Sequence, residues 1–116
     1  MQERNIAAAR SLKPATVFAA LGDPVRLAII ARLCTDGPLQ TIQLKQSTNL
    51  TRQAVTKHLW VLEDVGLLQS DRAGRNRSWR IDARQLEIAR AYLDQISAHW
   101  DARLERLRSF VEDEVG

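Results

Sequence analysis

One stretch, residues 51–63, constrains the fold of this chain more than any other, because it predicts a helix with two incompatible faces. At the helical step of about 100° per residue, Val55, Leu59 and Leu62 fall on one apolar stripe that can anchor the helix in a core. The opposite face is rich in hydrogen-bond donors and has no carboxylate before residue 63; it carries Gln53, Thr56, Lys57 and Trp60. An ordinary amphipathic surface helix would show the same alternation, so the pattern alone leaves a surface helix and a binding helix equally open.

The start of this helix suits an anion. The Thr51 hydroxyl can accept a hydrogen bond from a free amide of the first turn and so cap the helix. The other free N–H groups of that turn, with Arg52 beside them, favour a phosphate.

The segments on either side predict a winged helix-turn-helix. A short helix at about Leu39–Gln46 and a polar turn at Ser47–Asn49 come before, which together with the two-faced helix make a helix-turn-helix. Gly66 then closes the second helix as a C-cap. Two strands follow at Leu67–Asp71 and Arg77–Asp82. The expected fold is mainly α with a small β-hairpin, in the order α-α-α-α-β-β-α.

The predicted hairpin concentrates positive charge at its tip. Arg72, Arg75 and Arg77 lie in or beside the turn at 72–76, which contains Gly and Asn. Guanidinium groups this close repel one another unless an anion lies between them. The alternative is a well-solvated edge that resists aggregation. On the second strand Trp79 alternates with polar neighbours, which predicts one buried face.

Two helices are expected before the helix-turn-helix. Pro14 can begin a two-turn helix that Gly22 ends. Asp23 and Pro24 then form a strong start signal for a helix that runs to about residue 35. Apolar residues are so dense in this second helix that we expect it to be the most buried one. Its cysteine is expected to be a small apolar filler, with a redox switch as the alternative. The apolar residues are Leu27, Ile30, Ala31, Leu33 and Cys34.

A single long helix is predicted from Arg84 to about Glu112. Its apolar residues follow three- and four-residue steps, close to a heptad seam. They are Leu86, Ala89, Leu93, Ile96, Trp100, Leu104, Leu107 and Val111. So small a domain has little core for so long a stripe, so we expect a second copy to cover it; folding back over its own domain is the alternative. Glu105 and Arg108 are spaced for an ion pair.

The chain accordingly divides into three parts. We expect residues 1–13 to be an N-terminal extension, residues 14–83 to be a winged helix-turn-helix core that binds DNA, and residues 84–116 to be a helix that dimerises.

The composition says more about where the protein is expected to be and what it can bind than about what it does. The length of 116 residues fits one domain, and a formal charge of +3 is only weak support for a nucleic-acid partner. The single cysteine excludes an internal disulfide and fits a reducing cytoplasm. No apolar run approaches the ~20 residues of a membrane span, and no export signal is apparent at the N-terminus, so we expect a cytoplasmic protein without a membrane partner. No nucleophile–base arrangement or phosphate loop is present, so we do not expect an enzyme. A protein-interaction module built on the long helix remains the second hypothesis.

Three pieces of the sequence resemble the ArsR/SmtB family of winged-helix repressors. They are Phe18–Leu27, with its LGDPVR core, Thr51–Leu59, and Leu62–Leu68. The resemblance implies a homodimer held by the first and last helices, double-stranded operator DNA read by the second helix of the helix-turn-helix, and a wing that reaches phosphates or the minor groove. The implied dimer contacts are Phe18, Leu93, Ile96, Trp100, Leu104 and Leu107.

The metal sites of that family do not carry over. Where arsenic- and cadmium-type members have cysteines, this chain has Leu39–Gln43. The last helix offers His99 with only scattered carboxylates, whereas zinc requires three or four convergent ligands. We therefore expect no metal or other cofactor. The terminal pattern, with Tyr92-Leu93 and Phe110–Glu112, resembles a metal-free branch whose members often accompany small hydrophobe-binding proteins, so an unidentified small-molecule inducer is a further candidate partner.

The expected mechanism is that of a dimeric repressor on an imperfect palindrome. Gln and Arg side chains can read adenine and guanine edges, whereas Thr, Lys and wing arginines would hold phosphates. His58 is either a residue at the edge of the apolar core or a hydrogen-bond donor to a phosphate. The candidate DNA-binding residues are Thr51, Arg52, Gln53, Thr56, Lys57, His58, Arg72, Arg75 and Arg77.

Overall fold

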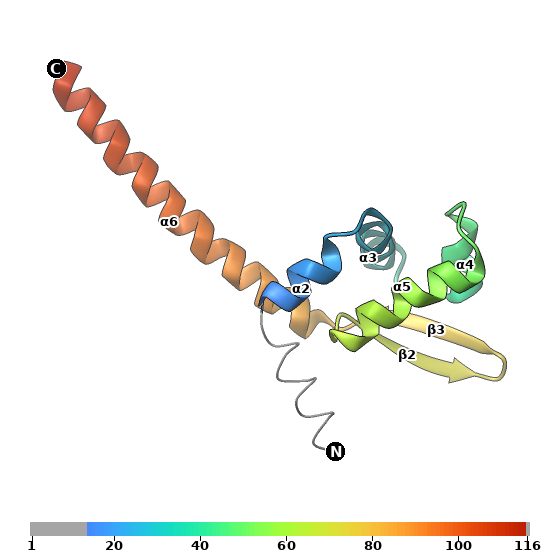
Figure 1. Ribbon diagram of the computed structural model, residues 1–116. Coiled ribbons are helices and arrows are strands. Elements are labelled where there is room, and N and C mark those ends of the chain that lie inside the picture. The colour runs from blue at the N-terminus through green and yellow to red at the C-terminus, as the bar shows by residue number, and fades with distance from the viewer. Residues whose placement is uncertain (1–13, 116) are drawn as a thin grey trace.

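The computed structural model describes residues 14–115 and has two parts, a small winged helix-turn-helix and a long helix that leaves it (Figure 1). The predicted extension at residues 1–13 lies outside the described residues. In chain order the elements are α2 (Pro14–Leu21), α3 (Pro24–Asp36), β1 (Leu39–Gln40), α4 (Thr41–Gln46), α5 (Arg52–Asp64), β2 (Leu68–Ala73), β3 (Asn76–Ile81) and α6 (Ala83–Val115).

The helix boundaries follow the capping residues that the sequence predicted. Asp23 accepts hydrogen bonds from the amides of Val25 and Arg26 at the start of α3. Helix α5 ends with the amide of Gly66 bonded to the carbonyl of residue 63 and that of Leu67 bonded to the carbonyl of Leu62. This is the Schellman arrangement; it needs a residue with positive φ, and Gly66 has φ of 82°. Both predicted caps are confirmed.

The sheet has three strands where the sequence predicted two. Its order is β1-β3-β2, all antiparallel, with Leu39 paired to Trp79 and Gln40 to Ser78. The expected helix start at Leu39 is therefore wrong, and α4 begins at Thr41. The physical reason is twofold. Leu39 pairs with Trp79 in the sheet and its side chain is buried in the core. The Gln43 side-chain oxygen accepts a hydrogen bond from the Gln40 amide at 2.8 Å, which holds Gln40 in extended conformation before the helix.

The strands β2 and β3 are longer toward the turn than expected. The predicted limits were 67–71 and 77–82, whereas the ladder runs from Leu68 opposite Ile81 to Ala73 opposite Asn76. The turn is thus reduced to Gly74 and its neighbour at position 75, and the positive φ of Gly74 suits the first central position of a two-residue hairpin turn.

The core lies between the helices and the sheet. Trp79 is its largest member, and its indole N–H donates to the Thr41 hydroxyl at 2.9 Å, so this buried polar group is satisfied. The rest of the core is aliphatic: Val17, Ala20, Ile29, Ile30, Leu33, Leu39, Leu44, Val55, Leu59, Leu62, Leu67, Leu68 and Ala89.

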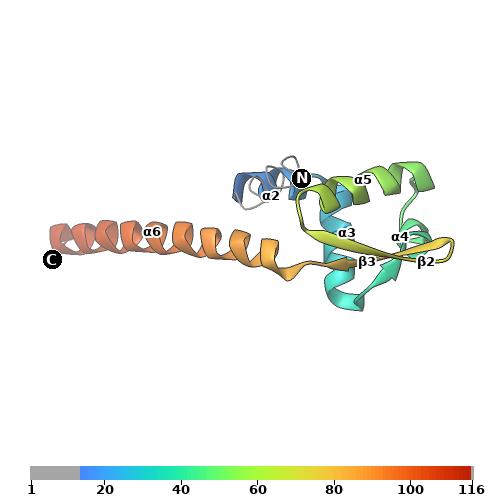
Figure 2. The ribbon, with the colours of Figure 1, turned by 90° about the horizontal axis from the view of Figure 1, so that it is seen from below.

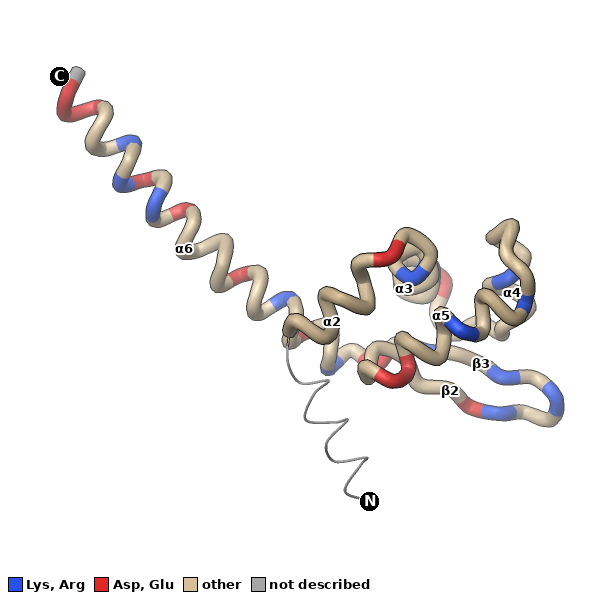
Figure 3. Tube along the Cα trace, viewed as in Figure 1, with Lys and Arg blue, Asp and Glu red and all other residues tan. Residues whose placement is uncertain are grey.

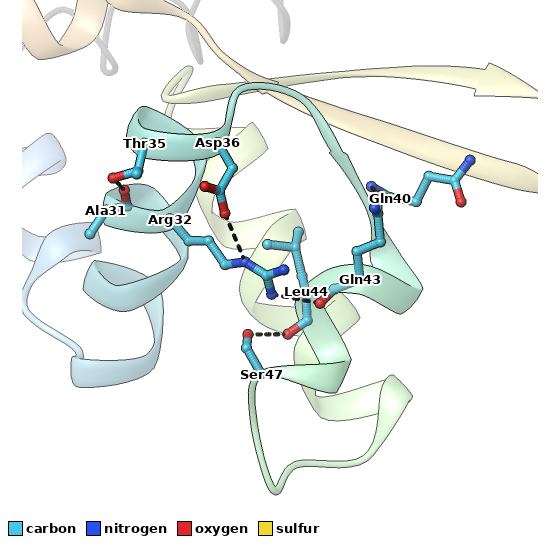
Figure 4. Close-up of polar contacts among 8 residues, drawn as sticks. All are labelled: Ala31, Arg32, Thr35, Asp36, Gln40, Gln43, Leu44 and Ser47. Atoms are coloured by element: carbon cyan, nitrogen blue, oxygen red, sulfur yellow. Dashed lines mark hydrogen bonds and ion pairs between the residues drawn. The ribbon is translucent and has the colours of Figure 1, made fainter.

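Arg32 connects α3 to the helix-turn-helix (Figure 4). Its Nη1 donates to the Gln43 carbonyl of α4 at 2.6 Å, and its Nε donates to Asp36 at 3.3 Å within α3. One guanidinium therefore fixes the first helix of the motif against the helix before it.

Helix α3 is less buried than its composition predicted. Ile29, Ile30 and Leu33 face the core, but Leu27 is 53% exposed and Ala31 and Cys34 are exposed. The interpretation of the cysteine as a core filler is wrong. Apolar density shows that a helix can be buried, but the covering layers of a domain this small reach only one side of it.

Helix α6 packs on the domain only at its beginning. Ala89 is buried there, Leu86 packs against the core, and the rings of Phe18 and Tyr92 are 6.0 Å apart. The helix then projects away from the remainder of the molecule, which gives an overall extent of 71 Å (Figures 1 and 2). The ion pair expected for Glu105 does not form; Arg108 pairs instead with Glu112 at 3.2 Å.

Candidate nucleic-acid interface

The two faces of α5 lie as the sequence predicted. Val55, Leu59 and Leu62 have no exposed surface, whereas Gln53 and Lys57 on the opposite face are exposed. Burial of the apolar stripe therefore turns the donor-bearing side of the helix outward.

The first turn of α5 is capped as expected. The Thr51 hydroxyl accepts the amide of Ala54 at 3.1 Å. The Thr56 hydroxyl donates its proton to the carbonyl of Arg52 at 2.8 Å. To donate to a phosphate instead, the hydroxyl would have to break that bond. Arg52 is exposed at the start of the helix.

The wing brings its arginines to the same side as α5. In the β2–β3 register Arg72 lies directly opposite Arg77, two positions beyond the pair of Ser70 and Trp79. Because side chains alternate along a strand, both arginines share the face of the sheet on which Trp79 is buried. Like charges directly opposite one another destabilise a pair of strands. An anion bound between the two guanidinium groups would remove that repulsion.

A hollow of about 270 Å³ separates α5 from the wing. Its walls are mostly polar, and they combine residues from both elements with one from the start of α4: Thr41, Arg52, Thr56, Trp60, Arg72, Arg75, Asn76, Arg77 and Trp79. Figure 3 shows the corresponding concentration of Lys and Arg along the wing tip, α4 and the adjacent part of α5. Four arginines on one concave surface form a candidate site for a polyanion.

The opposite face of the wing is electrically different. Arg80 donates to Asp71 across the two strands at 3.2 Å. That guanidinium is matched by a carboxylate, so the excess positive charge of the hairpin lies on the face toward α5.

His58 does not join the other predicted site residues. Its Nδ1 lies 3.4 Å from a guanidinium nitrogen of Arg26 and 3.8 Å from Asp23, at the start of α3. Backbone hydrogen bonding from the Arg26 amide lowers the pKa of Asp23, which keeps a negative charge beside the imidazole. This geometry favours the boundary role of His58 over that of a phosphate donor.

Two features of the interface were missed by sequence reasoning. The sequence places Trp60 on the donor face but indicates no role for it; in the structure it is 54% exposed and forms a wall of the hollow. Ser70 bonds both Glu63 at the end of α5 and Arg77 on β3. A serine on a strand carries no signal in a single sequence, because its partners are brought together only by the fold.

The predicted dimer stripe is uncovered in the single chain. Five of its members are about half exposed or more: Leu93, Ile96, Trp100, Leu104 and Leu107. Phe18, the sixth predicted contact, is partly buried against the core. Val111 continues the stripe, with Phe110 beside it, and both are exposed.

Neither a metal site nor a membrane span is found within residues 14–115. No three His, Cys, Asp or Glu side chains of this part converge as metal ligands would. None of its helices has the length and apolarity that crossing a membrane requires.

The fold and the interface define a winged-helix protein of the DNA-binding kind. The chain is 32% identical over 101 residues to the HTH-type transcriptional regulator Rv2034 of Mycobacterium tuberculosis, an alignment that covers 87% of this chain and 91% of that protein. It is 42% identical over 67 residues to the uncharacterized HTH-type transcriptional regulator YuzN of Bacillus subtilis, covering 53% of this chain and 73% of that protein. No family model matches the sequence.

Solved structures agree with the sequence comparison. An ArsR-like transcriptional regulator from Rhodococcus sp. RHA1 superimposes with a TM-score of 0.68 at 33% identity, covering 84% of this chain and 91% of that one. The ArsR family transcriptional regulator RHA00566 superimposes with a TM-score of 0.69 at 29% identity, covering 75% and 89%. The chain belongs to the ArsR family and is a DNA-binding transcriptional regulator.

Proposed function

We propose that this regulator is a cytoplasmic, homodimeric repressor that binds an imperfectly palindromic operator. The observation that carries the proposal is the concave surface shared by α5 and the wing, where an outward donor face meets a cluster of arginines. A major groove accepts an α-helix of this size, and the adjoining phosphates would lie beside the wing.

The side chains of α5 divide by chemistry. Gln53 and Arg52 are the base readers, because an amide can pair with the edge of adenine and a guanidinium with that of guanine. Lys57, Thr51 and Thr56 hold phosphates on either side. The wing arginines add phosphate contacts at the flank, and His58 is not part of the surface.

The exposed stripe on α6 supports the homodimer. An apolar row from Leu93 to Val111 is continuous along the helix and has no cover from its own domain. Pairing with the same row of a second copy would remove it from water and hold two α5 helices at a fixed separation. For reading successive major grooves, that separation is about 34 Å.

Two substitutions on α5 test this division of labour. We expect Lys57→Ala to weaken binding to all DNA sequences alike and to reduce the slope of log affinity against log salt by about 0.9, because one phosphate contact is lost. We expect Gln53→Ala to weaken binding to the preferred site by about 1–3 kcal/mol while binding to random DNA changes little. Titrations of both variants on the promoter of the protein's own gene and on a scrambled duplex, at several salt concentrations, measure these effects.

The wild-type protein provides the primary control. Equal affinity for promoter and scrambled DNA would contradict sequence-specific regulation at that promoter. Equal losses by the Gln53 variant on both duplexes would contradict its role as a base reader, and an unchanged salt slope for the Lys57 variant would contradict its phosphate contact.

A further inference from the structure

A chain of hydrogen bonds connects the end of α5 to the wing. The Ser70 hydroxyl donates to Glu63 Oε2 at 2.6 Å and accepts from Arg77 Nη1 at 2.9 Å. Glu63 is in the last turn of α5, Ser70 is on β2 and Arg77 is on β3, so three elements meet at one hydroxyl.

The direction of these bonds is determined by the groups themselves. A carboxylate can only accept and a guanidinium can only donate, so the single proton of Ser70 must point to Glu63 and leave its lone pairs for Arg77. The Arg77 guanidinium carbon also lies 5.8 Å from the centroid of the Trp79 ring. Since Trp79 is buried and bonded to Thr41, the guanidinium is held from two sides against rigid groups.

The held guanidinium lies in the wall of the hollow. Its fork carries five N–H donors, and the bond to Ser70 uses one of them. Arg72 lies directly opposite on β2, and Arg52 contributes from α5 to the same hollow. Glu63 is not among the residues that line the hollow. The intervening serine therefore lets the carboxylate orient Arg77 without placing a negative charge at the concave surface.

We propose that Glu63 and Ser70 are positioning residues. They hold the Arg77 guanidinium in a fixed orientation, in which it binds one backbone phosphate of the DNA between α5 and the wing. This inference rests on the proposed function and deepens it. Arg77 then differs from the other wing arginines. Arg75 is in the turn, and Arg72 donates to the carbonyl of Gly74 at 3.3 Å, within the wing itself. Neither is linked to α5 by a chain of hydrogen bonds like that of Arg77.

The test separates orientation from charge. We expect Arg77→Ala to reduce the salt slope of binding to a random duplex by about 0.9, because one phosphate contact is lost. We expect Ser70→Ala to weaken binding to the same duplex by about three- to tenfold with the wild-type slope retained, because the charge remains but its geometry is lost. Ser78→Ala is the matched control: Ser78 is half-buried like Ser70 but lies opposite Asp71 on the other face of the wing, and we expect wild-type binding.

A second pair of variants isolates the role of Glu63. Glu63→Gln and Glu63→Ala both remove the negative charge, but only glutamine keeps an acceptor for the Ser70 hydroxyl. We expect the alanine variant to bind at least threefold more weakly than the glutamine variant. Should Arg77→Ala fail to fold, Arg77→Lys replaces it: lysine keeps the charge but not the fork, so we expect the wild-type slope with the affinity of Ser70→Ala.

Distinct results would overturn the proposal. They are wild-type affinity for Ser70→Ala or Arg77→Lys, an unchanged salt slope for a folded Arg77→Ala, or equal affinities for the two Glu63 variants. All of these are measured on random duplex DNA, where a contact between Arg77 and a backbone phosphate contributes to binding without any recognition of bases. Failure of the proposed repressor function is a different observation, namely no preference of the wild-type protein for its promoter over the scrambled duplex.

Discussion

Gly66 shows how one residue can serve both a turn and a packing contact. It lies where α5 turns toward the wing, and its φ of 82° is a conformation that L side chains rarely adopt. A Cβ added there would also lie 3.1 Å from Gln85 Cγ. The absence of a side chain at Gly66 therefore lets the connection to the wing pack closely against the first turn of α6. The glycine is therefore required by two independent constraints.

We expect Gly66→Ala to lower the free energy of unfolding by about 2 kcal/mol, from backbone strain and from the contact with Gln85 together. Denaturant unfolding of the single variants and of Gly66→Ala with Gln85→Ala measures the two parts. The double variant lacks the three nearest atoms of the Gln85 side chain, so its additional loss over Gln85→Ala reports the backbone strain. Strict additivity would show that the close contact costs nothing.

At the scale of elements, the junction between β3 and α6 depends on one carboxylate. Asp82 accepts from the Arg84 amide at 3.1 Å, from Arg84 Nη2 at 2.7 Å and from Gln69 Nε2 at 2.7 Å. Its own amide donates to the carbonyl of Leu67. The same side chain thus caps the start of α6 and fastens it to the beginning of the wing.

These bonds give the junction a pH dependence. The hydrogen bond from the Arg84 side chain is the largest influence that lowers the pKa of Asp82, from 3.8 to about 2. Because the folded state holds this proton less well than the unfolded state, the stabilisation is complete above pH 3.8 and is lost as the pH falls toward 2. We expect Asp82→Asn to lower the free energy of unfolding at pH 7 by on the order of 1 kcal/mol, since the Arg84 partner is largely exposed and screened by water.

Unfolding measured at pH 7 and across pH 4 to 2 checks this prediction, with the difference from wild type expected to shrink toward pH 2. Asp71→Asn is the matched control, because the Asp71 carboxylate is 68% exposed and its partner Arg80 lies on the surface. We expect a change within about 0.5 kcal/mol for that variant. A constant difference between Asp82→Asn and wild type from pH 7 to pH 2 would contradict the electrostatic account.

At the scale of the whole molecule, the shape itself indicates a missing partner. A 33-residue helix extends from the domain with Trp100 at 58% exposure and an apolar row on either side of it. Large continuous apolar surfaces are rarely left in water by monomeric proteins. This exposed row is the observation behind the proposed homodimer, in which the α6 helices of two copies would pair and separate the two α5 helices.

We expect Leu104→Glu to shift the protein from dimer to monomer at micromolar concentration, because the new charge would be buried in the paired seam. Affinity for the promoter should fall with it, since each monomer presents only one α5. Sedimentation equilibrium and DNA titration measure the two effects. Ala102→Glu introduces the same charge on the opposite side of α6 and should leave the dimer intact; equal dissociation by both variants, or by neither, would contradict the assigned face.

Local rules explain why so much of the fold could be predicted from the sequence. Helical periodicity in α5, the Asp23 and Thr51 caps and the Gly66 terminus all act within a few residues, so each could be recognised in one dimension. The clustering of the arginines at the wing tip could be recognised in the same way, because they are close together in the sequence around a turn; the two-residue turn that pairs Arg72 with Arg77 appeared only in the structure. The positions assigned to DNA binding on α5 and the wing follow from these local elements; their contacts with DNA stay predictions.

The remaining features depend on tertiary packing and could not be seen in the sequence. Pairing of Leu39 with Trp79 made a strand of residues expected to be helical, and only the finished layers decided that Cys34 stays outside the core. Two sets of contacts join residues from different elements: His58 with Asp23 and Arg26, and Ser70 with Glu63 and Arg77. No pattern in the sequence indicates that these residues meet. Short-range geometry determined which elements form and where they end; which side chains meet was decided by the packing of those elements, because burial and long-range hydrogen bonds exist only once the chain is folded.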